Sequence, residues 1–142
     1  MKIVVIDGQG GSIGKEVIDQ LRKSIPDADI LAVGTNSTAT LAMLKAGASA
    51  SATGENPVVV ACRTADIIVG PIGIIESDAL LGEITPKMAA AISSSSGEKV
   101  LIPVNRCKIH IAGQPDIPLH DLIVSAVSVV RDMISRQKSL PR

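Results

Sequence analysis

The sequence contains no phenylalanine, tryptophan or tyrosine among its 142 residues. Aromatic rings are the usual platforms on which proteins stack nucleic-acid bases. The formal net charge is zero, so no basic field attracts a polyanion either. These two absences argue against a nucleic-acid-binding protein. They also leave the core to be built from isoleucine, valine, leucine, alanine and methionine.

Cysteine is scarce and long hydrophobic runs are missing. Cys62 and Cys107 lie far apart, without a CxxC motif or a Cys/His cluster, so we expect reduced thiols, with neither a metal site nor a disulfide framework. No stretch reaches the about 18 apolar residues that a membrane span needs. We therefore expect a soluble, cytoplasmic protein without a membrane partner. The length predicts one domain, residues 1–142.

Strand-like and helix-like patterns alternate along the chain. This alternation predicts an α/β fold with a single doubly wound, mostly parallel sheet, Rossmann-like, with helices on both faces. The central strands should be the second, the first and the one at residues 66–69. The predicted strands are residues 2–6, 29–33, 48–52, 66–69 and 99–104, and residues 107–112 alternate as a half-exposed edge strand would.

Helix signals follow most of these strands. The predicted helices are residues 16–23, residues 38–46 capped by Ser37, one capped by Asn56 with Pro57 in its first turn, one from Pro86 capped by Thr85, and residues 118–137. The last helix carries a complete apolar stripe. Val124 and Val129 fall outside that stripe, which indicates either a homodimer contact or an exposed aliphatic face.

A glycine-rich segment joins the first strand to the first helix. Its glycines, Gly8, Gly10 and Gly14, approximate the dinucleotide fingerprint with one extra residue before the last glycine. Glycines let a ligand approach the backbone, and the first amides of a helix have no internal partner. We therefore expect bare peptide nitrogens here that bind an anion.

Further polar or glycine-rich segments should lie at the same edge of the sheet, because the carboxyl ends of parallel strands meet there. The predicted cofactor-binding residues are Gly8, Gln9, Gly10, Gly11, Ser12, Ile13, Gly14, Thr35, Asn36, Gly70, Pro71, Ile72, Gly73, Asn105 and Arg106.

The end of the second strand bears on the choice of cofactor. NAD sites carry an acidic residue there for the ribose 2′-hydroxyl, whereas this chain has Thr35 and Asn36. Hydroxyl and amide groups tolerate a 2′-phosphate better than a carboxylate does, so the sequence favours NADP over NAD. Arg106 could pair with a phosphate at the same rim.

Two charged residues flank the glycines. A carboxylate at Asp7 would repel a diphosphate, so we expect it to brace the loop's own amides rather than to bind magnesium. Lys15 could contact a phosphate or lie in solvent. The segment departs from a P-loop at Gln9 and Glu16, which argues against an ATPase.

No nucleophile and base can be paired from the sequence, and no catalytic residue is assigned. His110 and His120 are isolated, and Glu76, Asp78 and Glu83 lie in a long loop that could be a lid. The leading prediction is binding of a nucleotide or dinucleotide. The alternatives are an enzyme acting on a small phosphorylated or carboxylated metabolite, with Asp7, Glu55 or Glu83 as acid or base, and a non-catalytic oligomeric ligand sensor.

Six short segments form a specific combination. They are residues 6–11 (IDGQGG), 33–36 (VGTN), 52–56 (ATGEN), 65–73 (ADIIVGPIG), 81–86 (LGEITP) and 103–107 (PVNRC). The combination resembles a family of small bacterial proteins that share a conserved domain of unknown function. The resemblance implies a Rossmann-like fold and no particular chemistry. Members often carry a further glycine where this chain has Ser12.

Overall fold

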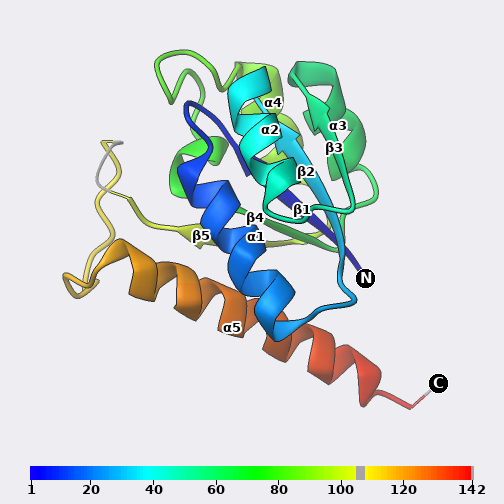
Figure 1. Cartoon of the computed structure of the whole chain (residues 1–142). Coiled ribbons are helices and arrows are strands. Elements are labelled where there is room, and N and C mark those ends of the chain that lie inside the picture. The colour runs from blue at the N-terminus through cyan, green and yellow to red at the C-terminus, as the bar shows by residue number, and fades with distance from the viewer. Residues whose placement is uncertain (105–107, 142) are drawn as a thin grey trace.

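The computed structural model describes residues 1–104 and 108–141, in which five strands form one parallel sheet flanked by helices (Figure 1). The strands are β1 (Lys2–Asp7), β2 (Asp29–Gly34), β3 (Ala50–Thr53), β4 (Ile67–Pro71) and β5 (Glu98–Ile102). The helices are α1 (Ser12–Ser24), α2 (Ser37–Lys45), α3 (Glu55–Cys62), α4 (Pro86–Ser94) and α5 (Leu119–Lys138), and a 3-10 turn, η1 (Ile72–Ile75), follows β4.

β1 lies at the centre of the sheet, whose strand order is β3-β2-β1-β4-β5. This order matches the first five strands of the Rossmann arrangement and confirms the predicted doubly wound α/β fold and its three central strands. The winding reverses between β1 and β4. The crevice at the carboxyl ends of these two strands is therefore where an open α/β sheet binds ligands.

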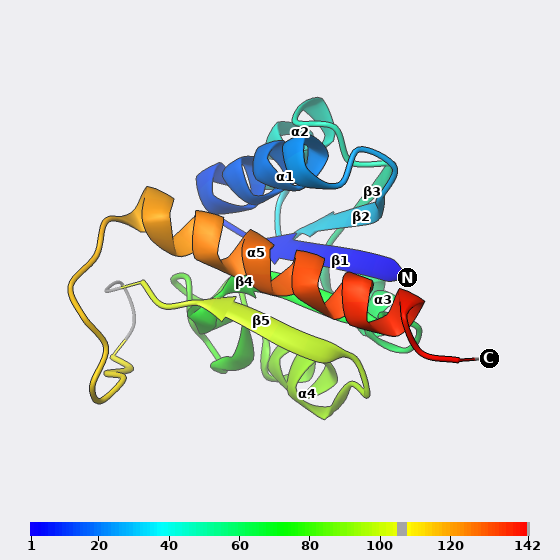
Figure 2. The same ribbon diagram turned by 90° about the horizontal axis from the view of Figure 1, so that it is seen from below.

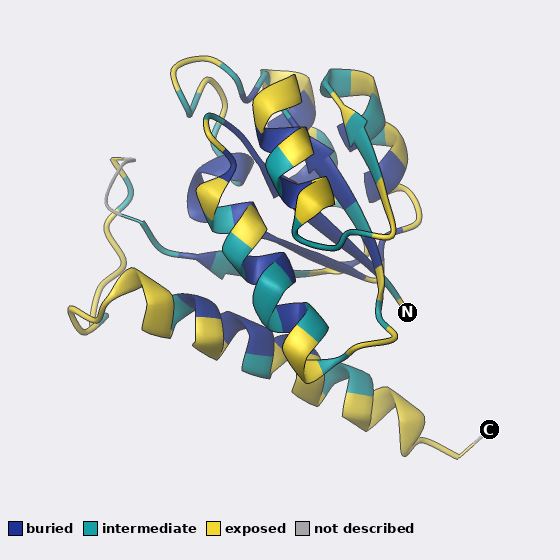
Figure 3. Ribbon diagram, viewed as in Figure 1, coloured by how far each residue is buried: buried dark blue, intermediate teal, exposed yellow. Residues whose placement is uncertain are grey.

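Helices cover both faces of the sheet and divide the core in two. Ile3 and Val5 of β1 point toward α1, α2 and α5, whereas Val4 and Ile6 point toward α3 and α4. Figure 2 shows α5 lying across the sheet beside β5, and Figure 3 shows buried strands between helices with exposed outer faces. Both core clusters are built from aliphatic residues, methionine and Cys62, as the composition requires.

Helix starts differ from the sequence prediction where the cap is not the expected residue. α1 begins at Ser12 rather than at residue 16, so the end of the glycine-rich segment forms its first turn. Asn36, not Ser37, caps α2, because its side chain accepts a hydrogen bond from the Ala39 amide. Gly54 occupies the position before α3 that was predicted for Asn56. Thr85 caps α4 as predicted.

The predicted edge strand at residues 107–112 is wrong for its described part, since residues 108–112 form no strand. Alternation alone produces a strand only where a neighbouring strand offers a partner. α5 matches the predicted last helix closely, and Val124 and Val129 are 43% and 39% exposed on it. Among the described residues, no helix is both long and apolar enough to cross a bilayer.

Candidate functional site

Asp7 ends β1 and holds the glycine-rich loop in shape. The side chain is 4% exposed, its Oδ1 accepts from the Gly8 amide at 2.8 Å, and its Oδ2 accepts from the Gly14 amide at 2.7 Å. One carboxylate thus ties the start of the loop to the first turn of α1. This confirms loop bracing, and both oxygens are engaged by backbone, which argues against a magnesium ligand.

The charge of Asp7 is balanced between opposing effects. Burial raises the pKa of Asp7 above its ordinary value, and the negative charge of Glu83 adds to the rise. The hydrogen bonds from the Gly14 and Gly8 amides act in the opposite direction by stabilising the carboxylate. The net direction is upward. Asp7 therefore serves the loop as an acceptor for the Gly8 and Gly14 amides.

Glu83 brings a second carboxylate to the same loop, from the segment between η1 and α4. Its Oε1 accepts from the Gln9 amide at 3.1 Å, from the Thr35 hydroxyl at 2.7 Å and from the Asn36 side-chain amide at 2.6 Å. The Asn36 amide also donates to the Gln9 carbonyl at 2.9 Å. Three donors from the ends of β1 and β2 thus converge on one oxygen atom.

These donors favour the ionised form of Glu83. Burial acts to raise its pKa, but the hydrogen bonds from Thr35, Asn36 and Gln9 together outweigh that effect and hold the pKa below its ordinary value. The cluster is therefore a site that stabilises an anionic oxygen. In this conformation the chain's own carboxylate occupies it.

Leu80 lies over the crevice between β1 and β4. A Cβ atom added at Gly8 would stand 2.8 Å from Leu80 Cδ1, 2.6 Å from Thr35 Oγ1 and 3.4 Å from Glu83 Oε1, and one added at Gly73 would stand 3.9 Å from Leu80 Cδ2. Leu80 thus spans the space between the loop after β1 and η1. Figure 1 shows the green segment that carries it beside the dark blue glycine-rich loop and the start of α2.

The backbone of this segment is strained. Asp78, Leu80 and Leu81 have φ values of 67°, 56° and 57°, and Gly82 follows at 88°. A left-handed conformation costs a residue with a side chain about 1–2 kcal/mol, and leucine has no polar group that compensates locally. The contacts of Leu80 and Glu83 with the glycine-rich loop offset that cost.

The expectation of bare loop amides is wrong for most of the loop in this conformation. The Gly8 and Gly14 amides donate to Asp7, the Gln9 amide donates to Glu83, and the Gly11 amide donates to the Gly8 carbonyl at 2.9 Å. In the described residues, the amides of Gly10 and Ser12 have no acceptor. The bonds to Asp7 follow from the expected bracing of the loop, whereas the sequence could not show the bond of the Gln9 amide, because its acceptor Glu83 comes from a segment more than seventy residues away in the chain.

The remaining predicted cofactor residues divide into five pairs. Thr35 and Asn36 lie in the donor cluster, and Ser12 and Ile13 lie in the first turn of α1. Gly70 and Pro71 end β4 and are buried, and a Cβ at Gly70 would overlap the carbonyl of Ile6, so this glycine is needed for strand packing. Ile72 and Gly73, in η1, are buried, and Gly73 lies next to Ala79 and Leu80. Asn105 and Arg106 lie outside the described residues, as does Cys107.

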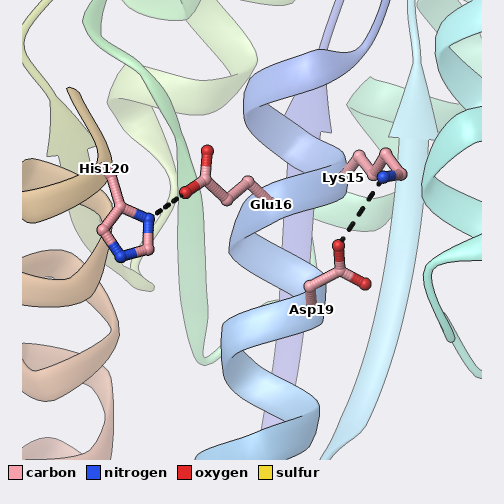
Figure 4. A network of polar contacts seen from close by, with 4 residues as sticks. All are labelled: Lys15, Glu16, Asp19 and His120. Atoms are coloured by element: carbon pink, nitrogen blue, oxygen red, sulfur yellow. Dashed lines mark hydrogen bonds and ion pairs between the residues drawn. The ribbon is translucent and has the colours of Figure 1, made fainter.

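In the described part of the chain, the side chains of the other charged candidates form no hydrogen bond or ion pair with the glycine-rich loop. Lys15 pairs with Asp19 at 3.8 Å on the exposed side of α1, and His120 contacts Glu16, joining the first turns of α5 and α1 (Figure 4). Glu55 lies in the first turn of α3. Cys62 is a buried free thiol whose pKa is raised by burial, which makes it unreactive. Among described residues, no group of three or more metal-ligating side chains is present.

Two cavities lie at the same edge of the sheet. One of about 510 Å³ is lined by Ile72, Pro103, Val104, most of residues 109–117 including His110, Leu119 and Leu122. The other, of about 260 Å³, lies between the end of β4 and the segment that carries Leu80. Neither is lined by the glycine-rich loop. Three predicted cofactor residues line these cavities, Ile72 the larger one and Pro71 and Gly73 the smaller one.

Sequence reasoning missed the partnership of Glu83 and Leu80 with the loop. It placed Glu83 in a long loop that could be a lid, but it paired Glu83 with no donor. One signal was present, because the donors Thr35 and Asn36 occupy the place where a carboxylate usually stands. When the carboxylate that usually ends the second strand is absent, the hydrogen-bond donors there need an acceptor from another part of the chain.

Comparisons with known proteins give a solved structure and a family model. Among solved structures, a dodecameric FMN-dependent UbiX-like decarboxylase from Escherichia coli O157:H7 is similar, with a TM-score of 0.46 and 17% sequence identity, over 92% of this chain and 76% of that chain. A likeness at this level does not extend to ligand or activity. The curated proteins include no match. The family model described as a domain of unknown function (DUF3842) matches residues 2–135, and the chain therefore belongs to this family.

Proposed function

We propose that the protein binds a phosphate-bearing nucleotide or dinucleotide at the carboxyl ends of β1 and β2. One observation carries the proposal, namely that Gln9, Thr35 and Asn36 direct three donors at a single carboxylate oxygen of Glu83. A carboxylate oxygen is the nearest side-chain equivalent of a phosphate oxygen in charge and hydrogen-bonding capacity. Glu83 therefore stands in for the ligand's anionic group.

The place of the cluster in the fold supports NADP as the specific ligand. In Rossmann-type sites the diphosphate lies on the first helix and the end of the second strand binds the adenosine ribose. Thr35 and Asn36 immediately follow β2, and neither carries a charge. A 2′-phosphate in the position of the Glu83 carboxylate would receive the same three hydrogen bonds.

The first turn of α1 supplies a place for the diphosphate. The Gly10 and Ser12 amides, which have no acceptor among the described residues, lie at the start of this 13-residue helix. Free amides and the helix dipole both favour an anion at such an end. The ligand would thus be held at two points, the start of α1 and the donor cluster after β2.

Glu83 also supports one alternative, an enzyme that uses it as acid or base on a small phosphorylated or carboxylated metabolite. All three donors bond to its Oε1, so its Oε2 accepts none of these hydrogen bonds. Asp7 and Glu55 are less suited, because Asp7 is committed to backbone amides and Glu55 lies on α3. This alternative predicts turnover that Glu83→Gln abolishes.

A melting-shift panel with NADP, NAD, ATP, FMN and pyrophosphate tests the proposal. A ligand at about 100 times its dissociation constant should stabilise the protein by about 2.7 kcal/mol. Asn36→Asp keeps the helix cap, since aspartate caps as well as asparagine, but it replaces a donor to the proposed 2′-phosphate with a carboxylate that repels it. It should abolish the NADP shift and spare any NAD shift.

Ser37→Asp is the matched control, because it adds the same charge one residue further along, at an exposed position. It should leave the NADP shift intact. The proposal fails if none of the five compounds changes the melting temperature of the unmodified protein or of a variant lacking the Glu83 carboxylate.

A further inference from the structure

The segment of residues 76–85 is fixed at its ends and exposed at its tip. Ile74 before it and Ile84 within it are fully buried, and Thr85 caps α4. Between them Leu81 is 96% exposed. The segment folds on itself through turn hydrogen bonds, from the Asp78 amide to the Ile84 carbonyl at 2.7 Å and from the Gly82 amide to the Asp78 carbonyl at 3.1 Å. It is therefore a compact loop anchored at both ends, with an exposed tip.

Two side chains of this loop contact the glycine-rich loop and fill different parts of the site. Leu80 covers Gly8 and reaches toward Gly73, where the crevice between β1 and β4 would admit a ligand. Glu83 accepts hydrogen bonds from the three donors at the ends of β1 and β2. An apolar group over the crevice and an anion on the donors together imitate the two kinds of contact that a bound nucleotide would make.

The conformation that allows these contacts is unfavourable by itself. Asp78, Leu80 and Leu81 are held in the left-handed region, where residues with side chains are rarely found. Such strain persists only when surrounding contacts maintain it. Once Leu80 and Glu83 leave the site, these residues can relax. Strain relief therefore favours the open loop and offsets part of the loss of its three hydrogen bonds.

We propose that residues 76–85 form a lid that occupies the ligand site with Leu80 and Glu83, so that lid closure and ligand binding exclude one another. This inference rests on the proposed function, because it concerns regulation of the same site. The lid lowers the apparent affinity by the fraction of molecules in which it is open. Anything that holds the lid open, such as a partner contacting the exposed Leu81, would raise the affinity.

The lid is tested by whether substitutions at Leu80 and Glu83 raise or lower the affinity for NADP. Glu83→Ala removes the group that competes with the ligand, and Leu80→Ala removes the side chain above Gly8. Titration calorimetry with NADP should show that each variant binds about tenfold or more tightly than the unmodified protein, because the open fraction rises. Glu76→Ala is the matched control, an identical change in the same segment at a residue without a side-chain bond to the glycine-rich loop. Its affinity should equal that of the unmodified protein.

The outcomes separate the two proposals. Weaker or unchanged NADP binding by Glu83→Ala and Leu80→Ala would overturn the lid and leave the proposed function standing, since the two side chains would then be part of the binding site. Absence of binding by every variant would overturn both. Hydrogen exchange gives a second readout, in which NADP should reduce the protection of the Asp78, Gly82 and Ile84 amides and increase that of Gly10 and Ser12. Greater protection of the lid amides on binding would contradict the exclusion.

Discussion

Gly10 and Gly11 are adjacent in the loop, yet they should respond in opposite ways to the same substitution by alanine. Gly11 has a φ of 74°, and a Cβ there would stand 2.7 Å from Ala39 Cα and 2.9 Å from the Ala39 carbonyl oxygen. Gly10 has no positive φ and nothing within 4 Å of the added atom. The packing of the loop against α2 therefore depends on Gly11, whereas Gly10 borders open space.

The expected cost at Gly11 has two parts. The left-handed backbone costs alanine about 1–2 kcal/mol. The steric overlap requires a shift of about 0.7 Å, from 2.7 Å to an ordinary contact of 3.4 Å, and the neighbour is backbone. Overpacking of this kind costs about 1–3 kcal/mol. The Gly11→Ala variant should thus lose about 2–5 kcal/mol, or about 6–15 °C in melting temperature for a domain of this size.

Gly10→Ala should retain or slightly raise stability, because alanine restricts the unfolded chain by about 0.4–1 kcal/mol. It should nevertheless weaken NADP binding, since its methyl group occupies the space through which a phosphate approaches the Gly10 and Ser12 amides. Thermal melts followed by far-UV circular dichroism suit a chain without aromatic residues. Equal melting temperatures for the two variants would refute the assignment of packing to Gly11 and of open space to Gly10.

Three further predictions concern the carboxylates and α5. The pKa of Glu83 is lowered in the folded protein, so its stabilising contribution should be complete above its ordinary pKa and lost as the pH falls below about 4.5; the difference in unfolding free energy between the unmodified protein and Glu83→Gln should shrink over that range, and a difference that is constant down to pH 3 would contradict the donor cluster. Asp7→Asn should cost about 1–3 kcal/mol in urea unfolding, because its amide group cannot accept from both the Gly8 and Gly14 amides; an unchanged midpoint would exclude the brace. Replacing Val124 and Val129 by glutamate should dissociate a homodimer built on that face of α5 while the fold persists; an unchanged sedimentation profile would argue against that interface.

Strand order and layer arrangement could be predicted from the sequence because each strand has a local signature. The run of residues 2–6 is buried on both sides of the sheet, and Thr85 with Pro86 marks a helix start whatever the tertiary context. The failures arose where local signals compete. Ser37 and Asn36 are both good caps, and only the geometry after β2 selects Asn36. The alternation in residues 108–112 met no neighbouring strand in the described structure.

The sequence predicted which segments come together at the candidate site, but not that Glu83 and Leu80 contact them. Parallel strands bring the segments after β1, β2 and β4 together at one edge, so Gly8, Thr35 and Gly73 converge as expected. The contact of Glu83 with Thr35 spans 48 residues and arises in a segment without periodicity. Left-handed leucines are also contrary to local preference, so no propensity argument predicts the turn that aims Glu83 at the loop.

Charge repulsion explains why the Glu83 carboxylate of the lid has to leave the three donors before a phosphate binds, and why a small shift of the lid is not enough. Lys15, the cation nearest in sequence to the loop, pairs with Asp19. The carboxylates of Asp7 and Glu83 both accept hydrogen bonds from the loop. A phosphate held about 4 Å from an ionised Glu83 would be repelled by about 4 kcal/mol at an effective dielectric constant of 20. The favourable effect of a helix N-terminus on an anion is at most about 2 kcal/mol. A phosphate can therefore bind here by replacing the Glu83 carboxylate on its three donors and not by binding beside it, since in the replacement one anion takes the place of another and the charge next to Asp7 changes little.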